Sequence, residues 1–154
     1  MKLLIDTNVV LDFLEKRAGG EAAKELFKLA ENDAQYECVS SSSVTDILYV
    51  VTKAMICTNR QKETVEQLSK SEVEVLARES VERLLSILHI LTVSEDSIKD
   101  AFALKWRDTE DALQYVVAKE NNIDVIITNN RSDFEASDIP LMTAQEFLGT
   151  LKTI

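Results

Sequence analysis

The sequence predicts an α/β fold in which a parallel sheet is covered by helices on both faces. Residues 3–5 form a short continuous apolar run, which is typical of a strand buried on both of its faces. Similar short runs recur along the chain and are separated by segments with helical periodicity. Strands that alternate with helices form βαβ units, and such units build a parallel sheet.

Each element is predicted from its own pattern of apolar residues and its end signals. Strands are expected at residues 3–5, 36–40, 89–93, 123–128 and 139–142. Helices are expected at residues 9–14, 22–30, 44–56, 73–88, 98–104 and 108–121, with a last helix from 143. Residues 41–43 are expected to form a turn, and the polar segment 58–71 to hold helical turns. Asn121 and Asn122 can end a helix because Asn tolerates the left-handed conformation, and Thr143 with Glu146 forms a capping box.

Length and composition indicate a single globular domain, residues 1–154. Apolar residues make up 45% of the chain and charged residues 29%, which excludes a disordered protein. The chain begins directly with a strand and has no apolar run of membrane-spanning length, so we expect a cytoplasmic protein. Cys38 and Cys57 are too few for a disulfide framework or a zinc site, and both are expected to be reduced.

The net charge of the chain restricts how it can contact nucleic acid. A formal charge of -10 argues against a protein that binds nucleic acid through a broad basic face. The same charge is compatible with an enzyme that gathers metal cations in an acidic pocket. Such an enzyme needs only a few local Lys or Arg residues to contact phosphates.

Acidic residues stand at strand ends or helix starts in four places of the predicted fold. They are Asp6, Asp46, Asp108 with Asp111, and Asp133. Because parallel strands end at the same edge of a sheet, these carboxylates are expected to converge. An oxygen-only group of this kind suits Mg²⁺ or Mn²⁺, and two such ions can activate a water and stabilise the leaving oxygen of a phosphodiester. Without a cation the carboxylates would repel one another, so the cluster implies a bound metal.

Each of these acids also has a structural interpretation. Asp6 can cap the following helix, although an Asp is unusual at the end of a buried apolar strand. Asp46 completes a Ser-x-x-Asp pattern that resembles a capping box. Asp108 is a natural N-cap with Asp111 at the N3 position, where the helix dipole favours the ionised form. Asp133 alone can be an ordinary surface residue, so the functional interpretation depends on the whole set.

Four motifs of the chain, in their order and spacing, resemble those of a known family. They lie at residues 3–8, 108–114, 128–134 and 141–148. On these residues the chain resembles the PIN domain family, the fold of metal-dependent ribonucleases that includes the VapC-type toxins of toxin–antitoxin pairs. The resemblance covers essentially the whole chain. It implies a three-layer α/β/α sandwich with a mostly parallel sheet.

The resemblance also implies an activity and its partners. It implies endonucleolytic hydrolysis of RNA with Mg²⁺ or Mn²⁺, frequent homodimers and, in the toxin branch, a cognate antitoxin protein. Asp6, Asp111 and Asp133 match the first, third and fourth metal-binding acids of the family. Asp46 falls at the position of the second acid, where the toxin branch more often has Glu, and Asp108 is a further candidate metal ligand.

Neighbouring polar residues fit the same comparison. Thr7 and Asn8 match the polar pair beside the first acid of the family, and Thr128 matches a hydroxyl near the site. Asn129 stands where many members of the family have Arg. A phosphate contact that those members make is therefore expected to be absent here.

Other protein classes are less compatible with the sequence. A haloacid-dehalogenase-type phosphatase would need a second acid at Asn8, and a receiver domain would need a Lys in the last strand, which residues 139–142 lack. A catalytically weak or inactive PIN-like module that acts by binding protein or RNA, and a deoxyribonuclease, stay open as alternatives. The Leu- and Val-rich helix at 73–88 is the expected surface for a second copy or an antitoxin.

Overall fold

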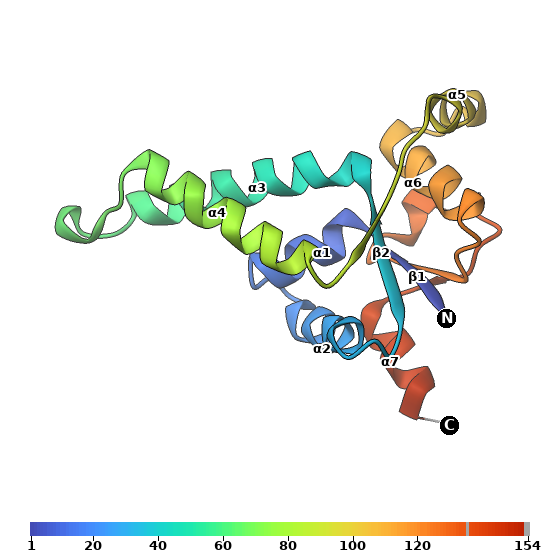
Figure 1. The fold of residues 1–154 in the computed structure, drawn as a ribbon, viewed down its shortest axis with the longest axis horizontal. Helices are drawn as coiled ribbons and strands as arrows, with labels where there is room; N and C mark the ends of the chain where they lie inside the picture. The colour runs from blue at the N-terminus through green and yellow to red at the C-terminus, as the bar shows by residue number, and fades with distance from the viewer. Residues whose placement is uncertain (135, 153–154) are drawn as a thin grey trace.

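A five-stranded sheet with the order β3-β2-β1-β4-β5 runs through the computed structural model, which describes residues 1–134 and 136–152 (Figure 1). Every strand pair in this sheet is parallel, and β1 lies at its centre. The strands are β1 (Lys2–Ile5), β2 (Tyr36–Ser40), β3 (His89–Leu91), β4 (Val125–Ile127) and β5 (Leu141–Met142).

Helices cover both faces of this sheet. They are α1 (Thr7–Leu14), α2 (Gly20–Glu31), α3 (Ser41–Arg60), α4 (Lys70–Leu85), α5 (Glu95–Leu104), α6 (Thr109–Glu120) and α7 (Ala144–Lys152), with 3-10 turns η1 (Thr64–Glu66) and η2 (Arg131–Phe134). Leu3 and Ile5 face one core, which α1, α2, α3, α4 and α7 complete, whereas Leu4 faces a second core with α6 and η2. The predicted three-layer α/β/α sandwich is confirmed. Among the described helices, none has the length and apolarity that crossing a membrane requires.

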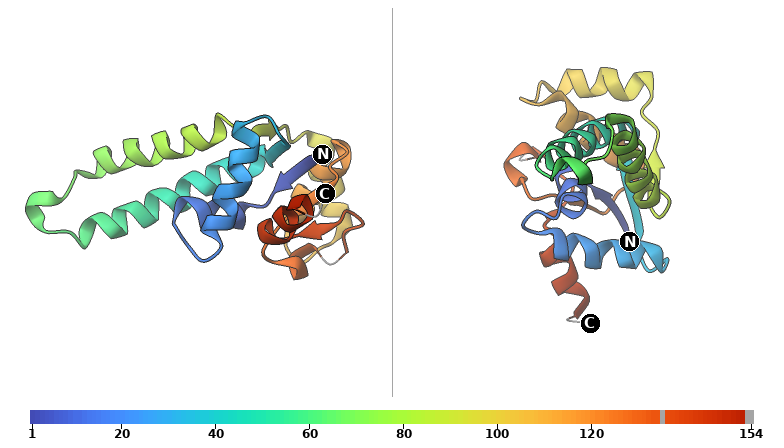
Figure 2. Two further views of the ribbon diagram at one scale, coloured as in Figure 1. Left: turned by 90° about the horizontal axis from the view of Figure 1, so that it is seen from below. Right: turned by 90° about the vertical axis from the view of Figure 1, so that its left-hand side faces the viewer.

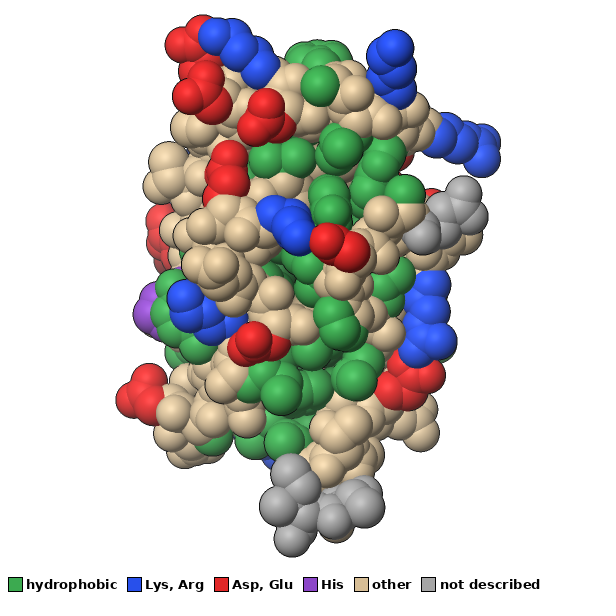
Figure 3. Space-filling view, turned by 90° about the vertical axis from the view of Figure 1, so that its right-hand side faces the viewer, with side chains coloured by type: hydrophobic (Ala, Val, Ile, Leu, Met, Phe, Trp, Pro, Cys, Tyr) green, Lys and Arg blue, Asp and Glu red, His purple; other side chains and the backbone are tan. Residues whose placement is uncertain are grey.

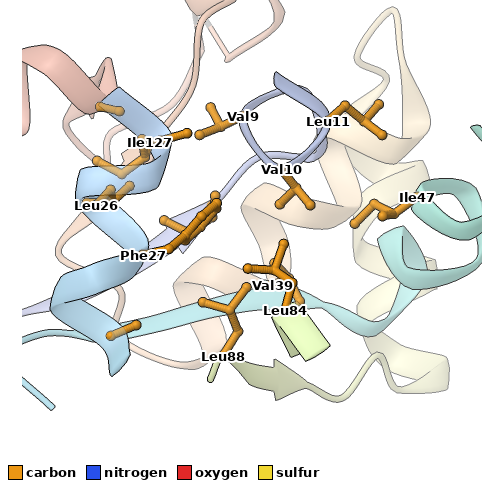
Figure 4. Close-up of a cluster of buried hydrophobic side chains, with 14 of the residues drawn as sticks. Val9, Val10, Leu11, Leu26, Phe27, Val39, Ile47, Leu84, Leu88 and Ile127 are labelled. Atoms are coloured by element: carbon orange, nitrogen blue, oxygen red, sulfur yellow. The ribbon is translucent and has the colours of Figure 1, made fainter. Parts of the chain in front are cut away.

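The larger core forms where α1 and α2 lie against the sheet (Figure 4). On α2 the buried residues Ala23, Leu26, Phe27 and Ala30 follow the i, i+3, i+4, i+7 spacing of a helix with one apolar face. The ring of Phe27 packs edge-on against Phe13 with ring centres 5.2 Å apart. This packing fixes the direction in which α1 leaves β1.

The prediction of a turn at residues 41–43 is wrong. Ser40 is the N-cap of α3, and its Oγ accepts a hydrogen bond from the backbone N–H of Ser42 at 3.4 Å. The serines that follow therefore form the first turn of a 20-residue helix. The Oγ of Ser41 also accepts a hydrogen bond from the backbone N–H of Val93 at 3.2 Å, which ties this turn to the segment after β3.

The helices α3 and α4 form a hairpin that extends away from the sheet (Figures 1 and 2). Asn59 closes the connection, because its side chain donates to the Leu68 carbonyl at 2.9 Å and accepts from the Leu68 N–H at 3.0 Å. A capping box between Ser69 and Glu72 then starts α4. One end of α3 thus lies at the sheet and the other projects from the body.

One acidic side chain, Glu37 on β2, lies inside the protein. It is 1% exposed, and neither of its carboxyl oxygens has a hydrogen-bond partner among the residues that the structure describes. Burial raises the pKa of Glu37 from 4.5 to about 8. The folded protein therefore holds this carboxyl group protonated at neutral pH.

Glu37 should make the stability of the protein fall as the pH rises. Between 4.5 and about 8 the folded state keeps a proton that the unfolded state releases. The stabilising contribution is complete below the unfolded pKa and is lost as the pH rises to the folded pKa, at about 1.4 kcal/mol per pH unit. We expect Glu37→Gln to exceed the parent in free energy of unfolding at pH 8 and to match it near pH 5, as measured by urea denaturation. A difference that does not vary with pH would contradict this assignment.

Candidate active site

Asp6 lies buried at the point where the central strand ends. Its side chain is 2% exposed and occupies the N-cap position of α1, but it makes no capping hydrogen bond. Instead, the Oγ of Thr128 donates to Asp6 Oδ2 at 2.8 Å, and the Nε2 of Gln114 donates to Asp6 Oδ1 at 3.3 Å. Asp6 therefore stands at the cap position of α1, as its structural interpretation predicts, while its carboxylate bonds to groups outside that helix. Groups from the end of β4 and from α6 hold both of its oxygens.

The environment of Asp6 acts on its ionisation in two opposing ways. Burial raises the pKa of Asp6, and the hydrogen bonds from Thr128 and Gln114 lower it. Within residues 1–134 and 136–152, no Lys or Arg forms an ion pair with this carboxylate. Both neighbours are neutral donors, so the described residues place no balancing positive charge on Asp6.

The start of α6 brings further acids to the same edge of the sheet. Asp108 is the N-cap of this helix, and its Oδ1 accepts a hydrogen bond from the Glu110 N–H at 2.8 Å. Asp111 is at the N3 position, as predicted. Burial, followed by the charges of Asp108, Asp6 and Asp133, raises the pKa of Asp111 to about 7. The acids from β1, α6 and η2 are therefore close enough to repel one another.

Asp46 is connected to this group of acids by its contact with Glu110. Asp46 is exposed on the second turn of α3, and because Ser40 caps that helix, its interpretation as part of a capping box is wrong. Burial raises the pKa of Glu110 to about 7, and the carboxylate of Asp46 adds to this by its charge and by a hydrogen bond. The Oγ of Ser43 also donates to Glu110 Oε1 at 3.5 Å.

The structure places the other predicted residues around this group. Asp133 is exposed in η2 and accepts a hydrogen bond from the side chain of Asn130. The backbone N–H of Asn130 in turn donates a hydrogen bond to Thr128 Oγ at 3.0 Å. The hydroxyl of Thr7 is buried without a partner in the described part of the chain, and Asn8 is exposed.

Asn129 has a partner that the sequence did not indicate. Its Nδ2 donates to the carboxylate of Asp12 on α1 at 2.5 Å. This contact links the loop after β4 to α1. The chain therefore uses a neutral amide at position 129 to hold two segments together.

Sequence reasoning missed Glu110 and Gln114 as members of the site. Glu110 lies between Asp108 and Asp111 in the sequence. Its position in this acidic motif could have indicated that it belongs to the site. Gln114 follows Asp111 by three residues and thus lies on the same face of α6, one turn deeper. It is 1% exposed, and its Oε1 has no partner within the described residues. A polar residue within an otherwise apolar inward face was the signal for it.

The chemistry of these donors fits a hard divalent cation, because all of them are carboxylate oxygens. Glu110 and Asp111 have raised pKa values partly because negative charges surround them, and a cation would remove that repulsion. Within the described ranges, no three side chains of Asp, Glu, His or Cys are grouped tightly enough for one ion. Such spacing is expected of carboxylates that repel one another.

Comparisons with known proteins identify the family. The chain matches the family model of the PIN domain over residues 2–132, and it therefore belongs to the PIN domain family. It is 25% identical over 159 residues to Ribonuclease VapC1 of Aquifex aeolicus (strain VF5), with 99% of this chain and 97% of that protein covered. The resemblance inferred from the motifs is confirmed.

Solved structures of low sequence identity share the fold. VapBC2 from Rickettsia felis, solved with a DNA fragment of its promoter, gives a TM-score of 0.62 at 17% identity, with 93% of this chain and 98% of that chain covered. A toxin–antitoxin complex from Klebsiella pneumoniae gives a TM-score of 0.58 at 20% identity, with the same coverage of 93% and 98%.

Two substitutions of Asp108 separate its capping role from its charge. Asn caps helices as well as Asp, so Asp108→Asn should leave the free energy of unfolding nearly unchanged, whereas Asp108→Ala should lower it by about 1 kcal/mol. Since the charge of Asp108 raises the pKa of Asp111, both variants should lower that pKa. Urea denaturation and carboxyl NMR titration of the metal-free protein measure these effects. Equal destabilisation by both substitutions would contradict the capping role.

Proposed function

We propose that this chain is a divalent-metal-dependent endoribonuclease that acts as the toxin of a toxin–antitoxin pair. The observation that carries the proposal is the buried carboxylate of Asp6, which faces the acidic start of α6 and has no cation among the described residues to balance it. Membership of the PIN domain family and the likeness to Ribonuclease VapC1 support this function.

Asp6, Asp111 and Asp133 are the residues proposed to hold Mg²⁺ or Mn²⁺, with Asp46 as the fourth acid and Asp108 as a further candidate. When bound, such a cation supplies Lewis-acid chemistry, which lowers the pKa of water and stabilises charge that develops on a phosphate. The protein's own task is to orient these acids and to offer hydrogen bonds that lower the pKa of Asp6.

The supporting residues each have a part in that task. Thr128 donates to Asp6 and favours its ionised form, since a hydrogen bond to a carboxylate stabilises the negative charge. Asp108 fixes the first turn of α6, on which Asp111 lies. Glu110 contacts Asp46 and thereby connects α6 with α3.

Replacement of Asp6 tests the activity directly. We expect Asp6→Asn to abolish Mg²⁺- or Mn²⁺-dependent cleavage of a mixed panel of structured RNAs, because the central carboxylate charge is lost while the shape of the side chain is kept. Circular dichroism and thermal unfolding should show that the variant is folded, since the substitution removes a buried charge. Gel analysis of the RNA with and without EDTA measures the activity.

Asp100→Asn on α5 is the matched control, because Asp100 is exposed and outside the acidic group. It should cleave like the parent protein. If highly purified Asp6→Asn retains cleavage, the assignment of Asp6 is wrong. If the parent binds neither RNA nor metal and cleaves nothing, the alternative of a PIN-like module that acts by binding protein is favoured.

A groove of about 810 Å³ offers a surface for the antitoxin. It lies where α1, α2 and the end of α4 meet, and the helix predicted as a partner surface forms one of its walls. Apolar side chains lie along it, and its four cationic side chains outnumber its two acidic ones. The lining includes Phe13, Leu14, Leu84, Ile87, Lys16, Arg17, Lys24, Arg83, Glu21 and Glu31. This combination suits an amphipathic segment with acidic residues, which is the partner proposed here. The likeness to toxin–antitoxin complexes supports the existence of such a partner.

Charge reversal on α4 tests this surface. Arg83→Glu should weaken the complex with the product of the adjacent reading frame by about tenfold, because it places a negative charge beside an acidic segment. Arg78→Glu is the matched control, since it lies on the same helix but does not line the groove. Co-purification and calorimetry measure the affinity. Equal effects of both reversals would contradict this docking site.

A second copy of the chain is a further proposed partner. The side of the molecule that carries α5 and α6 shows a strip of apolar side chains between scattered charges (Figure 3). On α5, Ile98, Phe102 and Leu104 are exposed, and the ring-bearing side chain of Phe102 is 65% accessible to solvent. Exposed large apolar groups of this kind favour self-association, which supports a homodimer.

A further inference from the structure

One face of α3 is exposed along its whole length and begins at the acidic site. Asp46, Tyr49, Lys53 and Arg60 are spaced by three, four and seven residues, which places them on the same side of a helix. All of them are exposed. At 1.5 Å per residue the face extends for about 21 Å from Asp46 along the projecting hairpin (Figure 2).

This face differs in charge from the rest of the chain. The protein has a net charge of -10, yet residues 47–62 contain three cationic residues and no acidic one. Among the described residues, neither Lys53 nor Arg60 forms an ion pair. The face therefore offers unneutralised positive charge directly beside the site where a phosphodiester would be cut.

Tyr49 adds an aromatic surface to these cations. Its side chain is 65% exposed, and the Lys53 ammonium lies 5.8 Å from the centre of its ring. A similar pair, Lys2 over Tyr36 at 5.7 Å, shows that such a contact is not itself a binding site. The Tyr36 ring, however, already stacks on His89 at 4.0 Å. Tyr49 has no aromatic partner among the described residues, so its ring is free to stack on a ligand.

We propose that the exposed face of α3 binds single-stranded RNA, with a base stacked on Tyr49 and with Lys53 and Arg60 beside the backbone phosphates. This inference rests on the proposed ribonuclease function and adds the path of its substrate. Stacking on an exposed aromatic ring tolerates any base, and nearby cations follow the phosphates of a single strand. An RNA duplex has no unstacked base for Tyr49, so the face selects single strands.

The first test measures stacking. A fluorescein-labelled short single-stranded RNA of mixed sequence is titrated with full-length protein carrying Asp6→Asn, and binding is followed by anisotropy. In this background Tyr49→Ala should weaken binding by about tenfold, because it removes one stacked base. Tyr49→Phe and Tyr49→Trp should keep the affinity, since both retain an aromatic ring. Tyr36→Ala is the matched control and should bind like the background protein, and the blunt RNA duplex should show no effect of Tyr49→Ala.

The second test measures the phosphate contacts. The double variant Lys53→Gln with Arg60→Gln should bind the single strand more weakly and should lower the slope of log affinity against log salt by about 1.4, because each contact contributes about 0.7. The matched control is Lys70→Gln with Lys99→Gln, whose parent residues each pair with a nearby Glu. It should leave the salt slope unchanged.

The outcomes separate this inference from the proposed function. If the parent protein cleaves RNA but Tyr49→Ala in the Asp6→Asn background binds like Tyr36→Ala, the α3 face is not the substrate path and the ribonuclease function stands. Equal losses in Tyr49→Ala and Tyr36→Ala also overturn the inference. If the parent neither cleaves nor binds RNA, both proposals fail together.

Discussion

The enclosure of the Asp6 carboxylate at the end of the central strand is the constraint on which the site depends. A buried ionised group is costly unless it is hydrogen-bonded or balanced by charge. Here Thr128 and Gln114 supply the hydrogen bonds, from β4 and from α6. Because both donors come from elements that pack directly beside β1, the position of Asp6 depends on the sheet being assembled correctly.

Acidic and cationic side chains are concentrated in different regions of this protein. The net charge of the whole chain therefore says little about its function. Acidic groups gather at the carboxyl ends of the strands, where burial and the charges of Asp108 and Asp6 raise the pKa values of both Glu110 and Asp111. The cations of α3 begin at Lys53, about two turns further along the same helix that contributes Asp46. The same helix therefore carries Asp46 near the acidic group and the cations Lys53 and Arg60 farther along. The net charge of -10 does not reveal this separation of acidic and cationic regions.

The order of the strands and helices was predictable because each has an apolar pattern of its own. The start of α3 was not, since the consecutive serines carry no periodicity and only the contact between Ser40 and Ser42 shows where the helix begins. Asp6 was predictable from its place after a buried strand. The contact of Asp46 with Glu110 was not predictable, because it depends on how two helices distant in the sequence are placed against each other. Gln114 had a signal in its place on an apolar inward face, but its contact with Asp6 depends on how α6 is placed against the end of β1.

The central position of β1 has a consequence for protein synthesis. The central strand β1 pairs with β4, and the hydrogen bond between Thr128 and Asp6 joins residues 122 positions apart. Contacts of such long range form only after the intervening chain is available. A nascent chain that has not reached β4 therefore holds Asp6 without its partners. The acidic group is completed only after β4 and residue 128 have been synthesised, so a chain that stops before them lacks the assembled group.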